Sequence, residues 1–306
     1  MASLANKYRP TVMSEVKGND NLKSIIVRTL KKKDRPQTYI LQGERGCGKT
    51  TMARIMAREF GGKGRDIREI NISDMRGIDT ARLLIESVGY APLLSDSKVI
   101  ILNEVHKATN EFQNAMLEKL EEPPANVYFI LCTTDPGRLL KPVLSRCALR
   151  NYSVQPLRRR EMKQLVLEVL AGENIKWRTE HITKLIKVVD GIPREALVLL
   201  DGLIELEEKR LTRALDELVN VVSELPVELV RAINGSAPWK EVARILKSLE
   251  GTTPDDIRWV ILKYMRKVLL DNPQPAKAHI IECFEDSFGD SGFAGLVLAC
   301  YKAVHF

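Results

Sequence analysis

The sequence lacks the patterns of membrane-spanning and disulfide-stabilised proteins. None of its apolar runs approaches the roughly 18 residues that a membrane helix requires, and its first residues have no apolar stretch of the kind found in secretory signals. Its five cysteines are scattered and never occur as C-x-x-C, which argues against a disulfide framework and a structural zinc site. We therefore expect a cytoplasmic protein with no membrane partner, located at the nucleoid, or in a host cytoplasm if the chain is viral.

Internal repeats and low-complexity segments are also absent from the 306 residues. At roughly 100 to 200 residues per domain, this length predicts two or three domains. Lys and Arg outnumber Asp and Glu by 47 to 40, which gives a net charge of +7. That excess favours a polyanionic partner, but it is also common on proteins that never contact nucleic acid. Charge alone therefore leaves the partner open.

The most informative feature that is present is a glycine-rich segment between an apolar run and an amphipathic helix pattern. Residues 43–50 match G-x-x-x-x-G-K-S/T at every fixed position. In such a loop, backbone N–H groups surround an anion, Lys49 reaches the β and γ phosphates, and Thr50 offers its hydroxyl to Mg²⁺. A plain glycine-rich turn would tolerate other residues at positions 49 and 50. The segment predicts a nucleoside triphosphate site, with these contacts: Gly43, Glu44, Arg45, Gly46, Cys47, Gly48, Lys49, Thr50 and Thr51.

Strand and helix patterns alternate through the first half of the chain, as in an α/β protein with a parallel sheet. From Glu161 onward the pattern is helical only, with a weaker break at Leu225 and Pro226. The predicted fold is an α/β P-loop nucleotide-binding domain followed by α-helical regions. We expect strands at 39–42, 68–71 (an edge strand), 99–102 (a fully buried central strand) and 127–132 (a second buried strand), and helices at 50–60, 78–88 and 110–121.

Polar residues follow two of the predicted strands. Asn103 and Glu104 stand where a P-loop NTPase usually has Asp and then Glu; the first helps to hold Mg²⁺ and the second polarises the attacking water. Asn103 keeps an acceptor oxygen but lacks the charge, so hydrolysis is expected to be slower and Asn103→Asp to improve the use of Mg²⁺. The alternative is that Asn103 only hydrogen-bonds within its loop. Thr134, with Thr133, can offer a hydroxyl to the γ-phosphate, although Thr-Thr-Asp-Pro alone is more often a simple turn.

Seven short motifs follow one another along the chain: Lys7–Pro10, the phosphate loop, Asn103–His106, Leu120–Pro124, Thr133–Pro136, Leu144–Cys147 and Gly191–Leu197. In this order they resemble the motifs of clamp-loader ATPases of the AAA+ superfamily, over about residues 5–205. Ser-Arg-Cys after Thr-Thr-Asp-Pro is specific to that family within the superfamily. The sequence looks most like bacterial tau/gamma subunits, followed by small subunits of replication factor C and phage clamp loaders.

The resemblance implies that the nucleotide is ATP, with Mg²⁺, and assigns roles to two arginines. Arg146 would be an arginine finger that acts on ATP held by a neighbouring subunit, an effect of about 10³ to 10⁵ in rate. Arg194 would be a second sensor that reaches the γ-phosphate of its own subunit. The residues that match the segment bordering the adenine are Tyr8, Arg9, Val16 and Gly18.

The resemblance also implies the domains and partners. Residues 1–156 would form the nucleotide-binding domain, 157–222 a helical lid and 223–306 a helical collar, the last assigned by its position and helical pattern. The implied partners are a sliding clamp, companion subunits in a pentamer, and primer-template DNA bound through phosphates without base readout. The candidate DNA contacts are Arg76, Arg82 and Lys107, each of which would more often be a solvated charge.

The expected function is therefore that of a clamp-loader ATPase subunit: ATP binding opens the clamp and binds DNA, and hydrolysis releases the clamp. One alternative is another AAA+ DNA motor or helicase loader, which the Ser-Arg-Cys motif opposes. The other is a weakly hydrolysing scaffold subunit, which Asn103 favours and Lys49, Glu104 and Arg146 oppose. Two departures from the family are Asn103 itself and the lack of the four-cysteine zinc insert of tau/gamma subunits.

Overall fold

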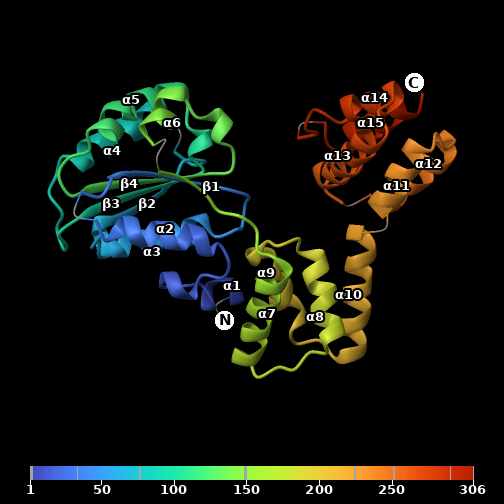
Figure 1. Ribbon diagram of the computed structural model, residues 1–306, viewed down its shortest axis with the longest axis horizontal. Helices are drawn as coiled ribbons and strands as arrows, with labels where there is room; N and C mark the ends of the chain where they lie inside the picture. Colours follow the sequence, from blue (N-terminus) through green and yellow to red (C-terminus); the bar gives the residue numbers. More distant parts are fainter. Residues whose placement is uncertain are drawn as a thin grey trace. The chain divides into compact units, whose positions relative to one another are not determined.

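A computed structural model describes residues 3–32, 34–75, 77–147, 150–223, 225–250, 252–289 and 291–305 (Figure 1). Backbone contacts divide the chain into two compact units. Unit 1 comprises Met1–Ile182 and Val189–Glu205, and unit 2 comprises Thr183–Val188 and Leu206–Phe306. The division into three domains, with boundaries after residues 156 and 222, stays a prediction. Among the described residues, none of the helices has the length and apolar character needed to cross a membrane.

The core of unit 1 is a parallel sheet of five strands in the order β2-β3-β4-β1-β5. Strands β3 and β4 are nearly continuous apolar runs because helices cover both faces of an interior strand. The predicted edge strand, β2, lies at an edge, and β3, predicted as a buried central strand, is an interior strand between β2 and β4. The strands are β1 (Thr38–Gln42), β2 (Ile67–Asn71), β3 (Lys98–Asn103), β4 (Val127–Thr133) and β5 (Asn151–Ser153).

Helices pack on both faces of this sheet (Figure 1). Ile26 of α2 and Met52 of α3 belong to the apolar core on one face, and Leu84 of α4 and Phe112 of α5 belong to the core on the other. The helices predicted at 78–88 and 110–121 are confirmed as α4 and α5, while α2 and α6 were not predicted. The helices are α1 (Leu4–Lys7), α2 (Asp20–Leu30), α3 (Lys49–Glu59), α4 (Ile78–Val88), α5 (Asn110–Glu121), α6 (Lys141–Arg146), α7 (Arg159–Gly172), α8 (Thr179–Val188, which passes from unit 1 to unit 2) and α9 (Pro193–Leu203).

The parallel topology brings the carboxyl ends of the strands to one edge of the sheet, where ligands bind in open α/β folds. In the strand register, Gln42 of β1 pairs with Thr133 of β4, and Asn71 of β2 pairs with Asn103 of β3. The backbone N–H of Gly43 donates to the carbonyl oxygen of Thr133 at 3.2 Å. The phosphate loop therefore begins directly beside the ends of the neighbouring strands.

The regular secondary structure in the described residues of unit 2 is all α-helical, as the sequence predicted. The apolar stripe that contains Val242, Ile245 and Leu246 is buried in its core. Arg258 lies within this core and donates to backbone carbonyl oxygens, so its buried guanidinium is satisfied. The helices after α8 are α10 (Glu208–Ser223), α11 (Leu225–Asn234), α12 (Trp239–Ser248), α13 (Pro254–Asp271), α14 (Pro275–Cys283) and α15 (Gly292–Val304).

Candidate active site

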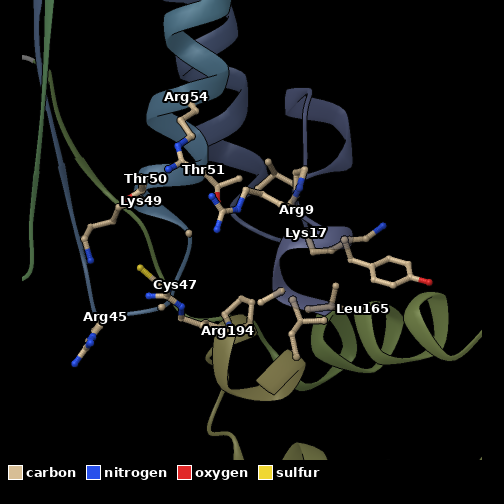
Figure 2. A pocket seen from close by; sticks show the side chains of 18 of the residues that line it. Arg9, Lys17, Arg45, Cys47, Lys49, Thr50, Thr51, Arg54, Leu165 and Arg194 are labelled. Carbon is tan, nitrogen blue, oxygen red and sulfur yellow. The ribbon is translucent and has the colours of Figure 1, made fainter. Parts of the chain in front are cut away.

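A cleft of about 900 Å³ lies at the carboxyl edge of the sheet, within unit 1. Its walls come from the N-terminal segment, the phosphate loop, the ends of β2 and β3, and helices α7 and α9. In Figure 2 the phosphate loop leads into α3, with Arg194 of α9 and Leu165 of α7 on the side away from α3. The volume falls within the roughly 300–1,000 Å³ of small-molecule sites.

Three glycines give the phosphate loop its path, because all three have a left-handed φ: +148° at Gly43, +85° at Gly46 and +108° at Gly48. A Cβ atom on Gly43 would lie 2.2 Å from the carbonyl oxygen of Val154, and one on Gly46 would lie 2.7 Å from a methyl carbon of Ile192. A Cβ atom on Gly48 would meet nothing within 4 Å. Packing and backbone conformation both require the first two glycines, whereas only the backbone conformation requires the third.

We expect Gly43→Ala to destabilise the protein more than Gly48→Ala. Both changes place an L residue at a left-handed φ, which costs about 1–3 kcal/mol. Only Gly43→Ala adds a clash with a backbone oxygen, for about another 1–3 kcal/mol of overpacking. Thermal unfolding of the two variants without nucleotide measures the difference. Equal losses of stability would contradict the close approach at residue 43.

Lys49 and Thr50 open helix α3 at the base of the cleft. Lys49 is only 6% exposed, and its ammonium donates to the carbonyl oxygens of Gly43 at 2.7 Å and Glu44 at 2.8 Å. The Thr50 hydroxyl lies 2.9 Å from Oδ1 of Asn103. The N-terminus of α3 also directs backbone N–H groups and the positive end of its dipole to this place. The helix start thus offers an ammonium, a hydroxyl and N–H donors to an anion.

Asn103 belongs to a chain of polar contacts across three elements. Its amide Nδ2 donates to Oε1 of Glu69 on β2 at 2.8 Å. The Glu69 carboxylate also accepts two hydrogen bonds, at 2.6 and 2.9 Å, from the guanidinium of Arg54 on α3. Arg54 and Glu69 were not predicted from the sequence, because Glu69 reaches Asn103 through the pairing of β2 with β3 and Arg54 reaches Glu69 from α3. Within the sequence, a charged residue on an edge strand carries no functional signal.

Glu104 follows β3 with a left-handed φ of +55°. Its carboxylate lies 3.5 Å from Nε2 of His106, and the same ring lies 3.3 Å from the hydroxyl of Thr133 and 3.5 Å from that of Thr134. Burial lowers the pKa of His106 below its ordinary value, against the opposing effect of Glu104. Glu104 lines the cleft, whereas His106, Thr133 and Thr134 are not lining residues. The two predicted sensor hydroxyls are therefore connected to Glu104 through an imidazole.

The N-terminal segment contributes three of its four predicted residues to the cleft. Tyr8, Arg9 and Val16 line it, whereas Gly18 does not. Gly18 instead approaches α7, where a Cβ atom would lie 2.7 Å from a carboxylate oxygen. The hydroxyl of Tyr8 donates to the carboxylate of Glu173 at the end of α7, and this hydrogen bond raises the pKa of Tyr8 to about 12. The segment is thereby attached to helix α7.

The two predicted catalytic arginines lie in different places. Arg194, in the first turn of α9, lines the cleft, and its backbone N–H donates to the carbonyl oxygen of Gly46 at 3.4 Å (Figure 2). Arg146, the last residue of α6, is not a lining residue. Its guanidinium donates to the carboxylate of Glu121 at 2.6 and 3.1 Å. The structure thus brings Arg194, and not Arg146, to the cleft of its own chain.

The structure describes two of the three candidate DNA contacts, Arg82 and Lys107. Arg76 lies outside the described residues. Arg82 on α4 is a surface residue whose side chain is 72% exposed, and it pairs with Asp79 of the same helix at 3.3 Å. Lys107 is exposed and lines the cleft. Their contact with DNA stays a prediction.

The side-chain oxygens of the cleft are suited to coordinate a Mg²⁺ ion that is also bound by phosphate oxygens. Among the residues that the structure describes, no group of three or more His, Cys, Asp or Glu side chains is arranged to hold a metal by itself. Mg²⁺ in nucleotide sites does not need one, because it takes one or two protein ligands beside phosphate and water oxygens. Thr50 and Asn103 supply two such oxygens 2.9 Å apart, and Glu104 lines the same cleft.

Comparison with known proteins finds similarity to subunits of DNA polymerase III and of replication factor C. Residues 61–155 match the family described as DNA polymerase III, delta subunit. The chain is 30% identical over 243 residues to DNA polymerase III subunit tau/gamma of Haemophilus influenzae, covering 72% of this chain and 34% of that protein. It is 33% identical over 227 residues to the gamma/tau subunit of Mycoplasma pneumoniae, covering 68% and 33%. The chain thus spans about a third of the length of these bacterial relatives.

A relative of more similar length is replication factor C subunit 4 of Encephalitozoon cuniculi, which is 30% identical over 205 residues, or 67% of this chain and 65% of that protein. Among solved structures, a RuvB variant of Thermotoga maritima superposes with a TM-score of 0.59 over 74% of this chain and 79% of its own, at 17% identity. At that identity the likeness concerns the fold alone, and it confirms the predicted α/β P-loop domain with helical regions after it. The motif order and the similarity to DNA polymerase III tau/gamma and replication factor C subunits together show that the chain belongs to the clamp-loader family of AAA+ proteins.

Proposed function

We propose that this chain is an ATP-hydrolysing subunit of a DNA polymerase sliding-clamp loader. The observation that carries the proposal is the meeting of Lys49, Thr50 and Arg194 in one cleft. An ammonium, a hydroxyl beside an amide oxygen, and a guanidinium are the groups that phosphoryl transfer requires around a triphosphate. Tyr8, Arg9 and Val16, on the N-terminal wall of the cleft, would border the adenine.

In this proposal the chain's own residues act by holding and orienting the triphosphate. The ammonium of Lys49 exchanges its two carbonyl contacts for the β and γ phosphates, and the loop N–H groups bind the same anion. Thr50 and Asn103 would hold Mg²⁺, which would neutralise phosphate charge. Glu104 orients the attacking water, and Arg194 places its guanidinium where negative charge develops on the γ-phosphate.

The remaining part of the reaction belongs to an assembly. Arg146, which lies outside its own cleft, would complete the cleft of a neighbouring subunit, and the subunits together would form a pentamer. The names of the relatives, DNA polymerase III subunits and a replication factor C subunit, support a sliding clamp and primer-template DNA as partners. ATP binding would open the clamp and bind DNA, and hydrolysis would release the clamp on the DNA.

Steady-state ATP hydrolysis by the chain with its companion subunits tests this function. We expect primed DNA and sliding clamp together to stimulate hydrolysis well above the rate with either one alone. Stimulation by DNA that is indifferent to the clamp would favour another AAA+ DNA motor. ATP binding without hydrolysis under every condition would favour the scaffold alternative, in which Asn103 limits the use of Mg²⁺.

We expect the stimulation of ATP hydrolysis by DNA to fall steeply as the salt concentration rises from about 50 to 200 mM, because phosphate contacts release counterions.

Arg82→Glu should weaken DNA binding by a similar factor for unrelated sequences, since phosphate contacts carry no base information. Arg213→Glu is the matched control, because Arg213 is 83% exposed on α10 and also pairs within its own helix. Fluorescence anisotropy with two unrelated primed DNAs measures the effect. Weakening confined to one of the two sequences would contradict the phosphate-contact role.

A further inference from the structure

Glu69 connects edge strand β2 to the polar end of β3 and to helix α3. It accepts from the Asn103 amide at 2.8 Å and from the Arg54 guanidinium at 2.6 and 2.9 Å. The side chains of Arg54 and Glu69 are only 33% and 29% exposed, and both line the nucleotide cleft. At the other end of this chain of contacts, Asn103 Oδ1 lies 2.9 Å from the Thr50 hydroxyl. Glu69 is therefore one residue removed from the oxygens proposed to hold Mg²⁺.

The chemistry of the contact determines how the Asn103 amide is oriented. An ionised carboxylate can only accept hydrogen bonds, so the NH₂ group of Asn103 must face Glu69. The amide oxygen is then the atom that remains for the start of α3 and Thr50. We infer that Glu69 is a positioning residue of the nucleotide site, which turns the oxygen of Asn103 toward Thr50 and the metal. This inference rests on the proposed function, because it concerns the metal side of the same site.

Glu69 also gives a reason for asparagine at position 103. An aspartate there would place a second carboxylate within hydrogen-bonding distance of Glu69, with the guanidinium of Arg54 as the partner of only one of them. Two carboxylates in contact repel, and an amide avoids that repulsion while keeping an oxygen for the metal. The sequence-based expectation that Asn103→Asp alone improves the use of Mg²⁺ did not include this neighbour. A carboxylate introduced by Asn103→Asp is stabilised if the side chain of residue 69 donates a hydrogen bond to it. The double variant Asn103→Asp/Glu69→Gln provides such a donor.

A purely structural role for Glu69 makes a different prediction. If Glu69 served only to attach α3 to β2 through its ion pair with Arg54, the loss of either partner would have the same effect on the nucleotide site. If Glu69 positions Asn103, the hydrogen-bond acceptor at residue 69 is what matters. Glu69→Gln keeps an acceptor oxygen for the Asn103 amide, whereas Glu69→Ala does not.

The first test measures ADP affinity of the full chain by titration, with and without Mg²⁺, and takes the ratio of the two. We expect Glu69→Ala to reduce this ratio by about tenfold, as loss of a residue that orients a metal ligand does. Glu69→Gln should stay within about twofold of wild type, since the acceptor is kept. Arg54→Ala should reduce the ratio less than Glu69→Ala. The control Glu59→Ala removes an exposed carboxylate of α3 and should change nothing.

Two results would overturn the positioning role: a wild-type ratio of ADP affinities in Glu69→Ala, or equal reductions of this ratio in Glu69→Ala and Arg54→Ala.

The second test measures thermal unfolding and needs neither metal nor nucleotide. We expect Asn103→Asp to lower the unfolding temperature by about 2–4 °C, the shift typical of one lost contact in a chain of this size. Adding Glu69→Gln should restore most of that loss, because the glutamine amide donates to the new carboxylate. A double variant as unstable as Asn103→Asp would refute the pairing.

The two tests separate this inference from the function on which it rests. If wild-type protein fails to bind nucleotide while the unfolding temperatures show the restored pairing, the proposed function fails and the Glu69–Asn103 pairing stands. If wild-type protein binds nucleotide with Mg²⁺ but the variants show neither effect, the function stands and the positioning role of Glu69 falls.

Discussion

Replacement of Lys49 by alanine should abolish ATP binding. Its buried ammonium lies against the loop carbonyls of Gly43 and Glu44, where β and γ phosphates would take their place. Removing one partner of a buried, hydrogen-bonded charge pair costs about 2–5 kcal/mol, which is about 30-fold to several thousand-fold in Kd. Isothermal titration of the variant with ATP and Mg²⁺ measures the loss.

The control for this change is Lys63→Ala, which removes an exposed lysine of the same unit. Because Lys49 also holds the loop through two hydrogen bonds, thermal unfolding and a second variant, Lys49→Met, separate lost folding from lost binding. Folded Lys49 variants that bind ATP with wild-type affinity would remove the basis for the whole proposed site.

Replacement of Arg146 by alanine should leave ATP binding intact and remove hydrolysis by the assembly. Its guanidinium lies outside the cleft of its own chain, paired with Glu121, and we predict that it acts on a neighbour's nucleotide. An arginine finger is worth about 10³ to 10⁵ in rate, and a loss of this order is expected when every subunit carries the change. Parallel measurements of ATP affinity and of steady-state hydrolysis distinguish the two effects.

Arg138→Ala is the matched control, since Arg138 is 70% exposed between β4 and α6 and pairs with Asp135. Mixing Arg146→Ala chains with wild-type chains should give intermediate rates that follow the fraction of wild-type fingers. An isolated wild-type chain that hydrolyses ATP at the full rate of the assembly would show that the site needs no neighbour, contrary to the proposal.

The sequence predicted most of the elements that form the nucleotide fold. The boundaries of α4 and α5 were predicted directly, because their apolar residues recur at helical spacing. The phosphate loop was recognisable because its residues act locally: glycines set the backbone path, and Lys49 begins the next helix. Helices α2 and α6 and strand β5 were missed, since each is short or only partly apolar and owes its stability to packing on the sheet.

The arrangement of the site was a matter of topology. The pairing of β1 with β4 puts Thr133 beside the phosphate loop, and His106 then connects the two threonines to Glu104. The sequence could not have shown that these residues meet, because the order of parallel strands depends on long crossover connections and not on any local pattern. The roles of these residues stay predictions until the variants are measured.

What the sequence by itself determined were the groups whose function depends on neighbours in the chain: the phosphate loop, Glu104, and the motif order that identifies the family. What only the tertiary structure decided was the setting of those groups. Glu69 and Asn103 are 34 residues apart and meet because β2 and β3 pair in parallel, and Arg146 lies 25 residues from the carboxylate that holds it. Side-chain contacts between distant segments follow from strand order and register, which no local sequence pattern specifies.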